Sequence, residues 1–570
     1  MPYRAPVDAV RFSLEVHAGL APERSEGILE EAARFAEERL APANVLGDRQ
    51  GCRFEGGEVA TPDGWPDIYR AWADGGWNSV DLPEEWGGMG LPTRLATATM
   101  EFWTSACMAF ALGPVLTQGA VDTLEIHGSD ALKALYLPRL VSGEWTATMN
   151  LTEPQAGSDL GLLRSQAEPA GDGTWRIRGS KIFITYGEHD LTENILHLVL
   201  ARLPDAPEGT KGISLFLVPK FLVHADGTLG ARNDVVCTGL EHKLGIHGSP
   251  TCSMAFGQGA GAIGWLVGEP HRGLACMFTM MNKARLFTGL QGVAVAERAF
   301  QHALAFARER KQGRATGARQ TSAIIDHPDV QRNLLRMRAL TAAGRALAHR
   351  AAAAIDRARE GDPGGEAAER AALLTPIVKA YCSDLGCEVT SLGVQIHGGM
   401  GYVEETGAAQ LFRDARITPI YEGTNGIQAI DLVLRKVLRP GSGLAETMIA
   451  EIAATAAAAR SAGLPRFAEA CSDAGSVLAE AIEWLRQNAG APERLLGSAT
   501  PFLRLFATGL ATGFLTEAAI VAARRRAAGQ DLALYRQTLD DARFYTENET
   551  VLMPGMGRIV MQSEILAEFA

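Results

Sequence analysis

The residue whose surroundings best suit chemistry is the single carboxylate of "TPIYEGTNGIQ", residues 418–428. Glu422 follows an aromatic residue and precedes Gly423 at the start of a polar turn. A carboxylate pressed against apolar groups has a raised pKa and can act as a base, and a glycine beside it lets a ligand approach the backbone closely. An ordinary acid in a surface turn is the commoner explanation of such a stretch. The choice between this explanation and a base therefore depends on the other motifs of the chain.

Two further motifs could hold the polar edge and the flat face of a cofactor. The loop "LTEPQAGSDLG" (151–161) crowds the hydroxyls of Thr152 and Ser158 among backbone amides, as loops that bind phosphates or polar cofactor edges do. In "KIFIT" (181–185) an aromatic residue between β-branched ones could lie against a ring, with Thr185 reaching the ring edge. A structural turn and an ordinary strand are the simpler explanations of the two stretches taken alone.

Glycines and a basic run could bind phosphate. Two adjacent glycines in "QIHGGMGY" (395–402) would normally cap a helix, but they would also let a pyrophosphate approach backbone N–H groups. The run "ARERKQGR" (307–314) could supply Arg310 to a phosphate, although such a helix end is usually solvated. The stretch "GAGAIG" (259–264) fits G-x-G-x-x-G, yet no helix start follows it and no acid stands about 20 residues on. It therefore predicts a glycine-rich β turn rather than a dinucleotide-binding fold.

Composition excludes several classes of protein. The chain has 570 residues, 47% of them hydrophobic and 21% charged, which is typical of a globular protein with about three or four domains. A net charge of -12 disfavours binding to nucleic acid or anionic membranes. The eight cysteines are scattered without a C-x-x-C pair, which indicates free thiols in a reducing compartment and no metal site. No stretch approaches the ~18 apolar residues of a transmembrane helix, so we expect a cytoplasmic protein without membrane insertion.

Hydrophobic periodicity divides the chain into parts. Helical spacing dominates to about residue 148, and short β-like runs separated by turn residues follow, which predict a small antiparallel β domain. Helical spacing then returns, and the stretch "LFATGLATGFLTEAAIVAA" (505–523) predicts a buried helix. The expected domains are an N-terminal extension with an α-helical domain (1–148), a middle β domain (149–270), an α-helical bundle (271–440) and an additional C-terminal α-helical domain (441–570).

Each motif is weak alone, but their order on an α–β–α layout is specific. In that order they resemble the acyl-CoA dehydrogenases, the FAD-dependent enzymes that desaturate acyl thioesters. The resemblance covers roughly residues 30–440. The N-terminal extension and the additional helical domain resemble the larger-subunit branch of that family, which includes enzymes for 3-methylmercaptopropionyl-CoA and for a broad range of fatty acyl-CoAs. The expected fold class is therefore α+β multidomain and acyl-CoA dehydrogenase-like.

The resemblance also implies which residues bind cofactor and substrate. FAD, held non-covalently, would meet the flavin-contacting residues of the middle domain and, across a subunit interface, residues that hold its pyrophosphate and adenosine. This implies a homodimer or a dimer of dimers. The implied cofactor-binding residues are Thr152, Ser158, Phe183, Thr185, Arg310, Gln395, Gly398, Gly399 and Thr424. The implied substrate-binding residues are Ser158, Arg285 and Gly423.

Glu422 matches the catalytic base of the family. Other branches place the base just before the arginine of the CoA-contacting helix, and that position is Ala284 here. By this resemblance Glu422 removes the α-proton of a bound acyl-CoA while hydride leaves the β-carbon for flavin N5, which yields the trans-2-enoyl-CoA. Electrons would then pass to an electron-transfer flavoprotein. Two positions depart from the family pattern: "RKQGR" (310–314) lacks a phenylalanine, and Gly426 stands where many relatives have glutamine.

Alternatives remain open at this point. The same fold could serve an acyl-CoA oxidase that uses O2, or a non-catalytic, nucleic-acid-associated flavoprotein. The basic run Arg524–Arg526 is the one feature that favours the last alternative, and Glu422 and the acidic net charge disfavour it. The sequence leaves open the acyl chain length and branching, a methylthio substrate, the electron acceptor and the role of residues 441–570.

Overall fold

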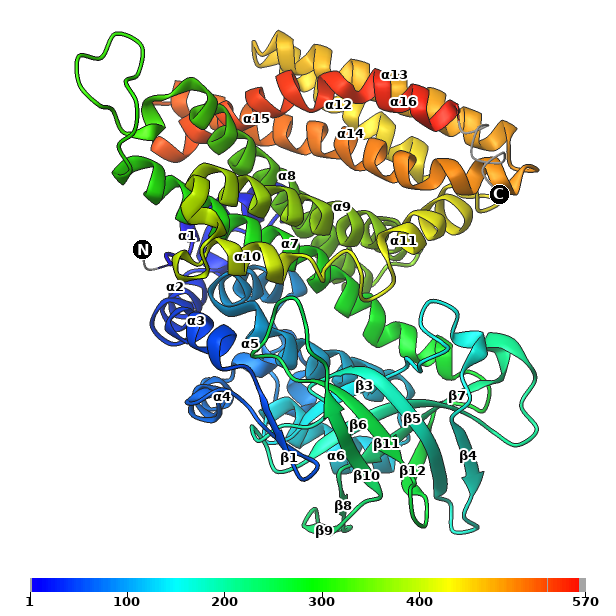
Figure 1. Ribbon diagram of the computed structural model, residues 1–570. Coiled ribbons are helices and arrows are strands. Elements are labelled where there is room, and N and C mark those ends of the chain that lie inside the picture. Colours follow the sequence, from blue (N-terminus) through cyan, green and yellow to red (C-terminus); the bar gives the residue numbers. More distant parts are fainter. Residues whose placement is uncertain (1–2, 531, 563–570) are drawn as a thin grey trace. The chain divides into compact units, whose positions relative to one another are not determined.

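The computed structural model describes residues 3–530 and 532–562. Contacts between residues divide the chain into two compact units. Unit 1 comprises Met1–Arg34, Thr93–Ser105 and Arg285–Ala570, and unit 2 comprises Phe35–Pro92 and Ala106–Ala284. Unit 1 is therefore assembled from three separated stretches of the chain, as the colours of Figure 1 show.

Unit 2 contains a mixed β-sheet with strands in the order β10–β11–β5–β12–β7–β6–β3, and β4 pairs with β5 and β6. The strands are β3 (Thr146–Asn150), β4 (Gln166–Pro169), β5 (Trp175–Thr185), β6 (Ile195–Arg202), β7 (Ile213–Pro219), β10 (Val235–Leu240), β11 (Thr251–Phe256) and β12 (Ala262–Val267). The pairs are antiparallel except that β3 and β4 run parallel to β6. The predicted middle β domain is thus confirmed, with parallel pairs that the sequence did not show.

Strands β6 and β7 are buried on both faces, which explains why they read as continuous apolar runs. Every residue of β7 is buried, and so is every residue of β6 except the last. On one face Leu198 and Leu215 belong to a cluster that includes residues of α5 and α6. On the other face Val199 and Phe216 pack in a second cluster. Two-sided burial removes the alternation that a solvent-facing sheet would show.

Short hairpins and helices complete unit 2. The hairpin strands are β1 (Arg53–Glu55), β2 (Glu58–Ala60), β8 (Phe221–Val223) and β9 (Leu229–Arg232). The helices that lie wholly in unit 2 are α3 (Ala41–Gln50), α4 (Trp65–Asp74) and α6 (Asp130–Ser142). The unit boundary falls inside α5 (Thr93–His127) and α7 (Gly273–Glu309). In α5 it coincides with a break in the helix, because Cys107 has φ -155° and ψ 90°.

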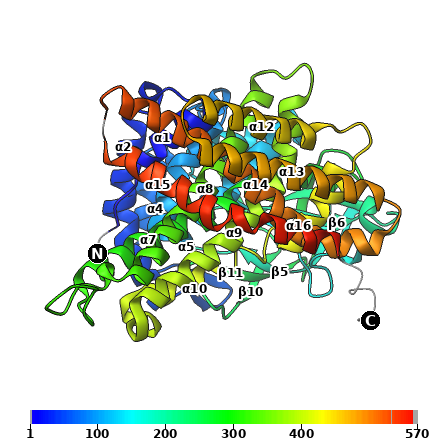
Figure 2. The ribbon, with the colours of Figure 1, turned by 90° about the horizontal axis from the view of Figure 1, so that it is seen from above.

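Unit 1 is helical. Its bundle contains the second part of α7 together with α8 (Pro328–Glu360), α9 (Glu366–His397), α10 (Ala408–Ala415) and α11 (Asn425–Asp431). The additional helices are α12 (Leu444–Ser461), α13 (Pro465–Gln487), α14 (Pro492–Ala527), α15 (Ala533–Asn548) and α16 (Met553–Met561). Near the N-terminus lie α1 (Val7–Ala18) and α2 (Ile28–Phe35). Helix α14 packs against α8, α9, α11 and α1, so the C-terminal helices are joined to the bundle along its length; Figure 2 shows these helices from above.

Single turns of 3-10 helix and π-helix connect these elements. The 3-10 turns are η1 (Pro22–Arg24), η3 (Trp77–Ser79), η4 (Glu84–Trp86), η5 (Leu160–Leu162), η6 (Gly209–Gly212), η7 (Ile324–Asp326), η8 (Gly398–Tyr402), η9 (Glu404–Thr406) and η11 (Thr550–Leu552). The π-helical segments are η2 (Ala36–Leu40) and η10 (Leu432–Val437). The second π-helical segment directly follows α11, close to the predicted base in the sequence.

Helices α5 and α14 are long and apolar enough to span a membrane by length and composition. The expectation that no stretch approaches this length was therefore wrong, because scattered polar residues do not lower the mean hydropathy of a long helix enough. However, the most apolar window is 100% buried in α5 and 89% buried in α14. Burial of this extent is typical of core helices, as predicted for residues 505–523.

A buried ion cluster fixes the mutual position of α5, α7 and α8 in unit 1. The guanidinium of Arg345 on α8 lies 2.6 Å from Glu101 Oε1 of α5 and 2.8 Å from Glu297 Oε2 of α7. The two carboxylates raise the pKa of Arg345 further above its usual value. Removing one member of such a buried set leaves an uncompensated charge, so this cluster holds in register the helix that carries Arg285.

Candidate active site

The turn that carries Glu422 has an unusual backbone. Glu422 has a φ of 57° and Gly423 a φ of 82°. Non-glycine residues rarely adopt the left-handed region, and they do so mainly at functional sites, where the surrounding structure holds them. Thr424 then caps α11, since its hydroxyl accepts a hydrogen bond from the N–H of Ile427 at 3.4 Å. The turn therefore presents Glu422 from a strained position directly before a helix N-terminus.

Side chains from three helices hold this turn. Arg285 Nε of α7 and Gln428 Nε2 of α11 both donate to the carbonyl oxygen of Glu422, at 3.3 and 3.2 Å. The hydroxyl of Tyr421 donates to Gln291 Oε1 of α7. From α9, Lys379 Nζ donates to the side-chain oxygen of Asn425 at 2.9 Å. These bonds over-determine the turn, which is the condition for keeping a strained residue in place.

The environment of Glu422 prepares its carboxylate to act as a base. Burial raises the pKa of Glu422 to about 7, and the positive charges of Arg285 and Lys379 partly oppose this rise. A base with a pKa near the working pH combines a useful deprotonated fraction with a strong drive to take a proton. The sequence prediction of a carboxylate with a raised pKa thus agrees with the structure, and the cause is burial rather than a neighbouring acid.

A hydrogen-bond donor also remains available beside the carboxylate. Within residues 3–530 and 532–562 the backbone N–H of Glu422 makes no hydrogen bond to the chain. A free backbone N–H near a proton-abstracting carboxylate can stabilise the negative charge that develops on a thioester oxygen. The turn therefore carries a carboxylate and an unengaged backbone N–H on one residue.

The predicted phosphate-binding residues of unit 1 lie near one another. The rings of Phe306 on α7 and His397 on α9 are 4.4 Å apart, so the helix end before Arg310 lies beside the end of α9. At that end Gln395, Gly398 and Gly399 are exposed. A side chain at either glycine would meet no atom within 4 Å, which leaves an open approach to the backbone. These residues have the donors and the space that a pyrophosphate requires.

The predicted flavin-contacting residues of unit 2 form a separate group. The N–H of Ile182 donates to the carbonyl oxygen of Thr152 at 2.9 Å, which joins the loop 151–161 to β5. Phe183 has a φ of 59° and remains 58% exposed. An aromatic ring held out to solvent by a strained backbone is suited to stack on a planar ligand. Thr185 is half-buried at the end of β5, where its carbonyl oxygen accepts from Thr148 at 2.6 Å.

An ion pair that the sequence did not indicate holds the loop 151–161 against strand β5. Lys181 Nζ lies 2.8 Å from Glu153 Oε1, and both side chains are almost fully buried. Glu153 also accepts hydrogen bonds from the N–H and the hydroxyl of Ser165. The Lys181 charge and these donors hold the pKa of Glu153 at about 2, although burial alone would raise it. The pair keeps the loop with Thr152 and Ser158 against the strand with Phe183.

The glycine stretch 259–264 does not bind a dinucleotide in the manner of a Rossmann fold. It leads into strand β12 rather than a helix. The N–H groups of Gly259 and Gly261 both donate to Asp234 Oδ2, at 2.8 and 3.0 Å. The prediction of a glycine-rich β turn is confirmed.

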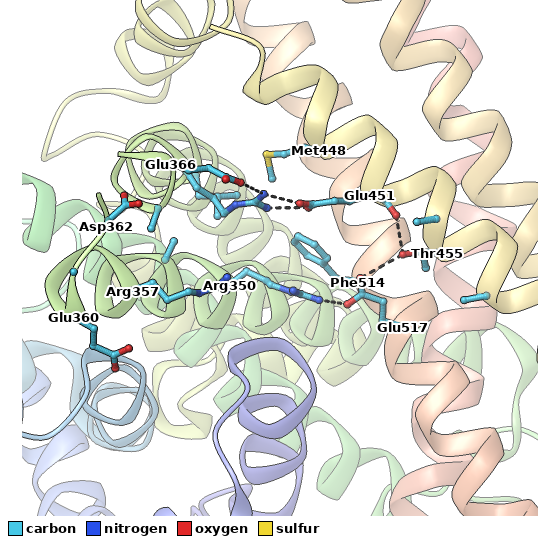
Figure 3. A pocket seen from close by; sticks show the side chains of 17 residues that line it. Arg350, Arg357, Glu360, Asp362, Glu366, Met448, Glu451, Thr455, Phe514 and Glu517 are labelled. Atoms are coloured by element: carbon cyan, nitrogen blue, oxygen red, sulfur yellow. Dashed lines mark hydrogen bonds and ion pairs between the residues drawn. The ribbon is translucent and has the colours of Figure 1, made fainter. Parts of the chain in front are cut away.

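A cavity of about 780 Å³ lies elsewhere in unit 1, among α8, α9, α12 and α14 (Figure 3). Four of its charged groups form ion pairs across the helices. Arg370 of α9 donates to Glu451 of α12 at 2.5 and 2.8 Å, and Arg350 of α8 pairs with Glu517 of α14. The predicted site residues do not line it. These ion pairs join the additional helices α12 and α14 to the bundle. The pair with Arg350 explains why Glu517 interrupts an apolar stretch.

Nearly the whole chain aligns with one acyl-CoA dehydrogenase. It is 47% identical over 572 residues to the 3-methylmercaptopropionyl-CoA dehydrogenase of Ruegeria pomeroyi, covering 97% of this chain and 96% of that one. The chain belongs to the acyl-CoA dehydrogenase family. Family models for the N-terminal, middle and C-terminal domains of acyl-CoA dehydrogenases match residues 22–144, 148–258 and 271–438 of this acyl-CoA dehydrogenase. The model described as acetyl-CoA dehydrogenase C-terminal like matches residues 448–566.

Other relatives of this acyl-CoA dehydrogenase agree with the assignment. It is 38% identical to the broad-specificity linear acyl-CoA dehydrogenase FadE5 of Mycobacterium tuberculosis over 72% of this chain and 69% of that one. Among solved structures, Caenorhabditis elegans ACDH-11 in complex with C11-CoA superposes with a TM-score of 0.81 at 20% identity, covering 96% of this chain and 92% of that one. At that identity the superposition shows the fold, including the additional C-terminal helices.

Sequence reasoning missed three residues that hold the Glu422 turn. These are Gln291, Lys379 and Gln428. Lys379 offered a signal, since it is the single charge in the otherwise apolar and polar-neutral stretch 376–383 of α9. A lone charged residue on a buried helix face needs a partner, but the sequence does not say which residue that partner is.

Proposed function

We propose that this acyl-CoA dehydrogenase oxidises the α,β bond of an acyl-CoA thioester to the trans-2-enoyl-CoA, with Glu422 as the base. The observation that carries the proposal is the Glu422 turn. It combines a strained backbone, a carboxyl pKa raised to about 7 by burial and an unengaged backbone N–H. Of the two base positions implied by the family resemblance, the other is Ala284, whose side chain cannot accept a proton.

The chain's own residues perform the proton transfer. The Glu422 carboxylate takes the α-proton, and the backbone N–H of the same residue stabilises the enolate oxygen as charge develops there. Arg285 and Lys379 keep part of the Glu422 population ionised before the proton arrives. A bound FAD would supply the acceptor for the hydride from the β-carbon, which takes up the two electrons that the oxidation removes.

The residues present fit a non-covalently bound FAD. The exposed ring of Phe183 suits the flavin face, and Thr152, Ser158 and Thr185 supply polar groups around it. In unit 1 Arg310, Gln395, Gly398 and Gly399 at the neighbouring ends of α7 and α9 offer donors to phosphates, and Thr424 offers its hydroxyl at the Glu422 turn. The corresponding role in the family crosses a subunit interface, so the proposal includes a homodimer or a dimer of dimers.

The finer assignments rest on the comparisons with relatives. We propose an electron-transfer flavoprotein as acceptor, in a reaction of the fatty acid β-oxidation type in the cytoplasm. The match to 3-methylmercaptopropionyl-CoA dehydrogenase over nearly the whole chain makes that thioester the first substrate to test. Ser158, Arg285 and Gly423 are proposed to contact the thioester and its CoA.

The nucleic-acid alternative loses its support in the structure. Arg525 of the basic run forms an ion pair with Glu15 and lies over the rings of Phe12 and Tyr535. The run therefore serves partly to dock α14 and α15 against α1. With the residue at its centre occupied within the fold, Arg524 and Arg526 are the exposed residues of the run, which is a small basic surface for nucleic-acid binding.

An anaerobic titration of the FAD-bound protein tests the proposal. We would add 3-methylmercaptopropionyl-CoA, butyryl-CoA and longer acyl-CoAs in turn and follow the flavin absorbance band. Bleaching by one of them in the wild type, with a rate lost in Glu422→Gln, is the expected result. Failure of every thioester to bleach the flavin would overturn the proposed activity. Hydrogen peroxide formed at the turnover rate in air would instead identify an oxidase.

A further inference from the structure

A fully buried lysine lies behind the Glu422 turn. Lys379 is on α9 and has 0% of its surface exposed. Its ammonium donates to the side-chain oxygen of Asn425, the first residue of α11, at 2.9 Å. Burying an ammonium group is costly unless an opposite charge or strong acceptors face it, so its position here calls for an explanation.

Asn425 connects this lysine to the backbone of α9 as well. Its side-chain nitrogen donates to Asp384 Oδ1 at 2.8 Å, to Ser383 Oγ at 3.0 Å and to the carbonyl oxygen of Ala380 at 3.1 Å. Its own backbone N–H donates to Pro419 at 3.1 Å, on the far side of Glu422 in the sequence. The amide of Asn425 is thus clamped between α9 and the loop 418–424, and Lys379 supplies the one charged donor in the clamp.

Charged residues from several helices act on Glu422, Asp384 and Lys379. Arg285 of α7 and Lys379 of α9 are the cations that act on Glu422. Burial raises the pKa of Asp384 of α9, and the hydrogen bond from Asn425 and the charges of Arg504 and Arg416 oppose this rise. The carboxylate that acts most strongly on Lys379 is Glu422, followed by Asp384. Lys379 is therefore attracted both to the carboxylate of the proposed base and to that of Asp384 on its own helix.

We propose that Lys379 is a positioning residue for the reaction: its ammonium holds Asn425, and so the turn that presents Glu422, while its charge stabilises the carboxylate form of the base. This inference rests on the function proposed above for Glu422. It adds a residue that touches neither substrate nor cofactor and acts through Asn425 and through the electrostatic field at Glu422.

Burial and charge give the direction of the electrostatic part. Burial lowers the pKa of Lys379 to about 7, and Glu422 and Asp384 oppose that fall. The pKa of Glu422 is raised to about 7 by burial and is held down by Arg285 and Lys379. Removing the charge of Lys379 therefore raises the pKa of Glu422 further. The rate of flavin reduction rises with pH as the base ionises, so its midpoint moves to higher pH.

Four variants of the FAD-bound enzyme separate the two roles. Lys379→Gln removes the charge but keeps an N–H donor for Asn425, and Lys379→Met removes both. Lys379→Arg keeps the charge. Ser383→Ala is the matched control, because it removes one neutral contact to Asn425 and leaves every charge in place. The readouts are the pH profile of flavin reduction by stopped flow and amide hydrogen exchange of residues 418–431.

The expected pattern is specific. In Lys379→Gln the midpoint of the pH profile rises by about one unit, the size of effect that one nearby charge exerts, and exchange in 418–431 stays near the wild-type rate. In Lys379→Met the midpoint rises and exchange in this segment becomes faster. Lys379→Arg and Ser383→Ala keep the wild-type midpoint. A merely structural role for the lysine would not move the midpoint in the glutamine variant.

Each contrary result overturns a defined part. An unmoved midpoint in Lys379→Gln, or one that moves equally far in Lys379→Arg, overturns the electrostatic role. Unchanged exchange of 418–431 in Lys379→Met overturns the positioning role; if that variant yields no FAD-bound protein, Asn425→Ala replaces it in the exchange measurement. If no acyl-CoA reduces the wild-type flavin, the proposed function itself has failed, and hydrogen exchange still decides the positioning role.

Discussion

Glu422→Gln should inactivate the enzyme and stabilise its fold at the same time. The amide cannot take the α-proton, and positioned general bases contribute about 10²- to 10⁴-fold to the rate. We therefore expect flavin reduction to slow by about that factor while FAD remains bound. The variant should nevertheless be more stable than the wild type. Burial disfavours the charged form of the carboxylate, whereas the amide has no charge to bury.

The size of the stability gain follows from the raised pKa. The native state holds the Glu422 proton up to about pH 7, whereas an exposed glutamate releases it near 4.5. Raising the pH through this window therefore removes stability from the wild type, because the native state binds the extra proton there. The native and exposed values differ by about 2.5 units, so at about 1.4 kcal/mol per pKa unit the loss reaches about 3 to 4 kcal/mol above pH 7. The uncharged amide of the Glu422→Gln variant has no proton to lose in this window.

Calorimetric melting of the FAD-bound proteins at pH 5 and pH 8 measures the effect. For a unit of this size, about 3 to 4 kcal/mol corresponds to roughly 4 to 6 °C. We expect Glu422→Gln to melt roughly that much higher than wild type at pH 8, and the gap to narrow toward pH 5. Glu480→Gln on the exposed face of α13 is the matched control and should show no gap at either pH.

Two results would refute this reasoning. A Glu422→Gln enzyme that reduces its flavin within tenfold of the wild-type rate would place the base elsewhere. A melting difference that is the same at pH 5 and pH 8 would show that the Glu422 carboxyl is not held protonated by burial.

Further substitutions test other parts of the site. Phe183→Ala removes an exposed ring proposed to stack on the flavin, so the Kd for FAD, measured by fluorescence, should rise by about 2- to 10-fold; an unchanged Kd would contradict the stacking role. Gly423→Ala places a Cβ 2.7 Å from Gln428 Nε2 at a φ of 82°, so flavin reduction should slow by at least about fivefold with FAD still bound; a wild-type rate would show that the turn is not constrained. Arg350→Met leaves the carboxylate of Glu517 without its cation. Because burial already raises the pKa of this carboxylate, the free energy of unfolding should fall by about 1 to 3 kcal/mol. Urea unfolding of this variant beside Arg350→Lys measures the change.

Much of the fold could be predicted because the spacing of hydrophobic residues along the sequence indicates which of them are buried. The run 212–219 became β7 (Ile213–Pro219), since an apolar stretch bounded by turn residues has few other solutions. The hairpin of β1 and β2 was missed. Its strands are short and mostly exposed, so they show no apolar alternation. Its signal was the pair Gly56–Gly57, both with positive φ, which is the residue type that tight hairpin turns require.

The residues of the site also differ in how far the sequence predicts them. Glu422 could be identified because its neighbours in the sequence are also its chemical environment. Lys379 could not, because its partner Asn425 lies 46 residues further along the chain, and only packing of α9 against α11 brings them together. The break at Cys107 inside α5 escaped prediction for a related reason: it depends on tertiary structure rather than on a glycine or proline at that position.

The three-part construction of unit 1 has a consequence during synthesis. Phe12 of α1 packs against Tyr535, Ala518 and Ala522, which lie about 500 residues later in the chain. At ~5 to 20 residues per second on the ribosome, roughly 25 to 100 s separate the emergence of the two surfaces. For that time the apolar face of the first helix is without its final cover, and for about the second half of it unit 2 is already complete in sequence. Nascent chains shorter than about 520 residues should therefore be the ones that bind a holdase chaperone through their first 20 residues.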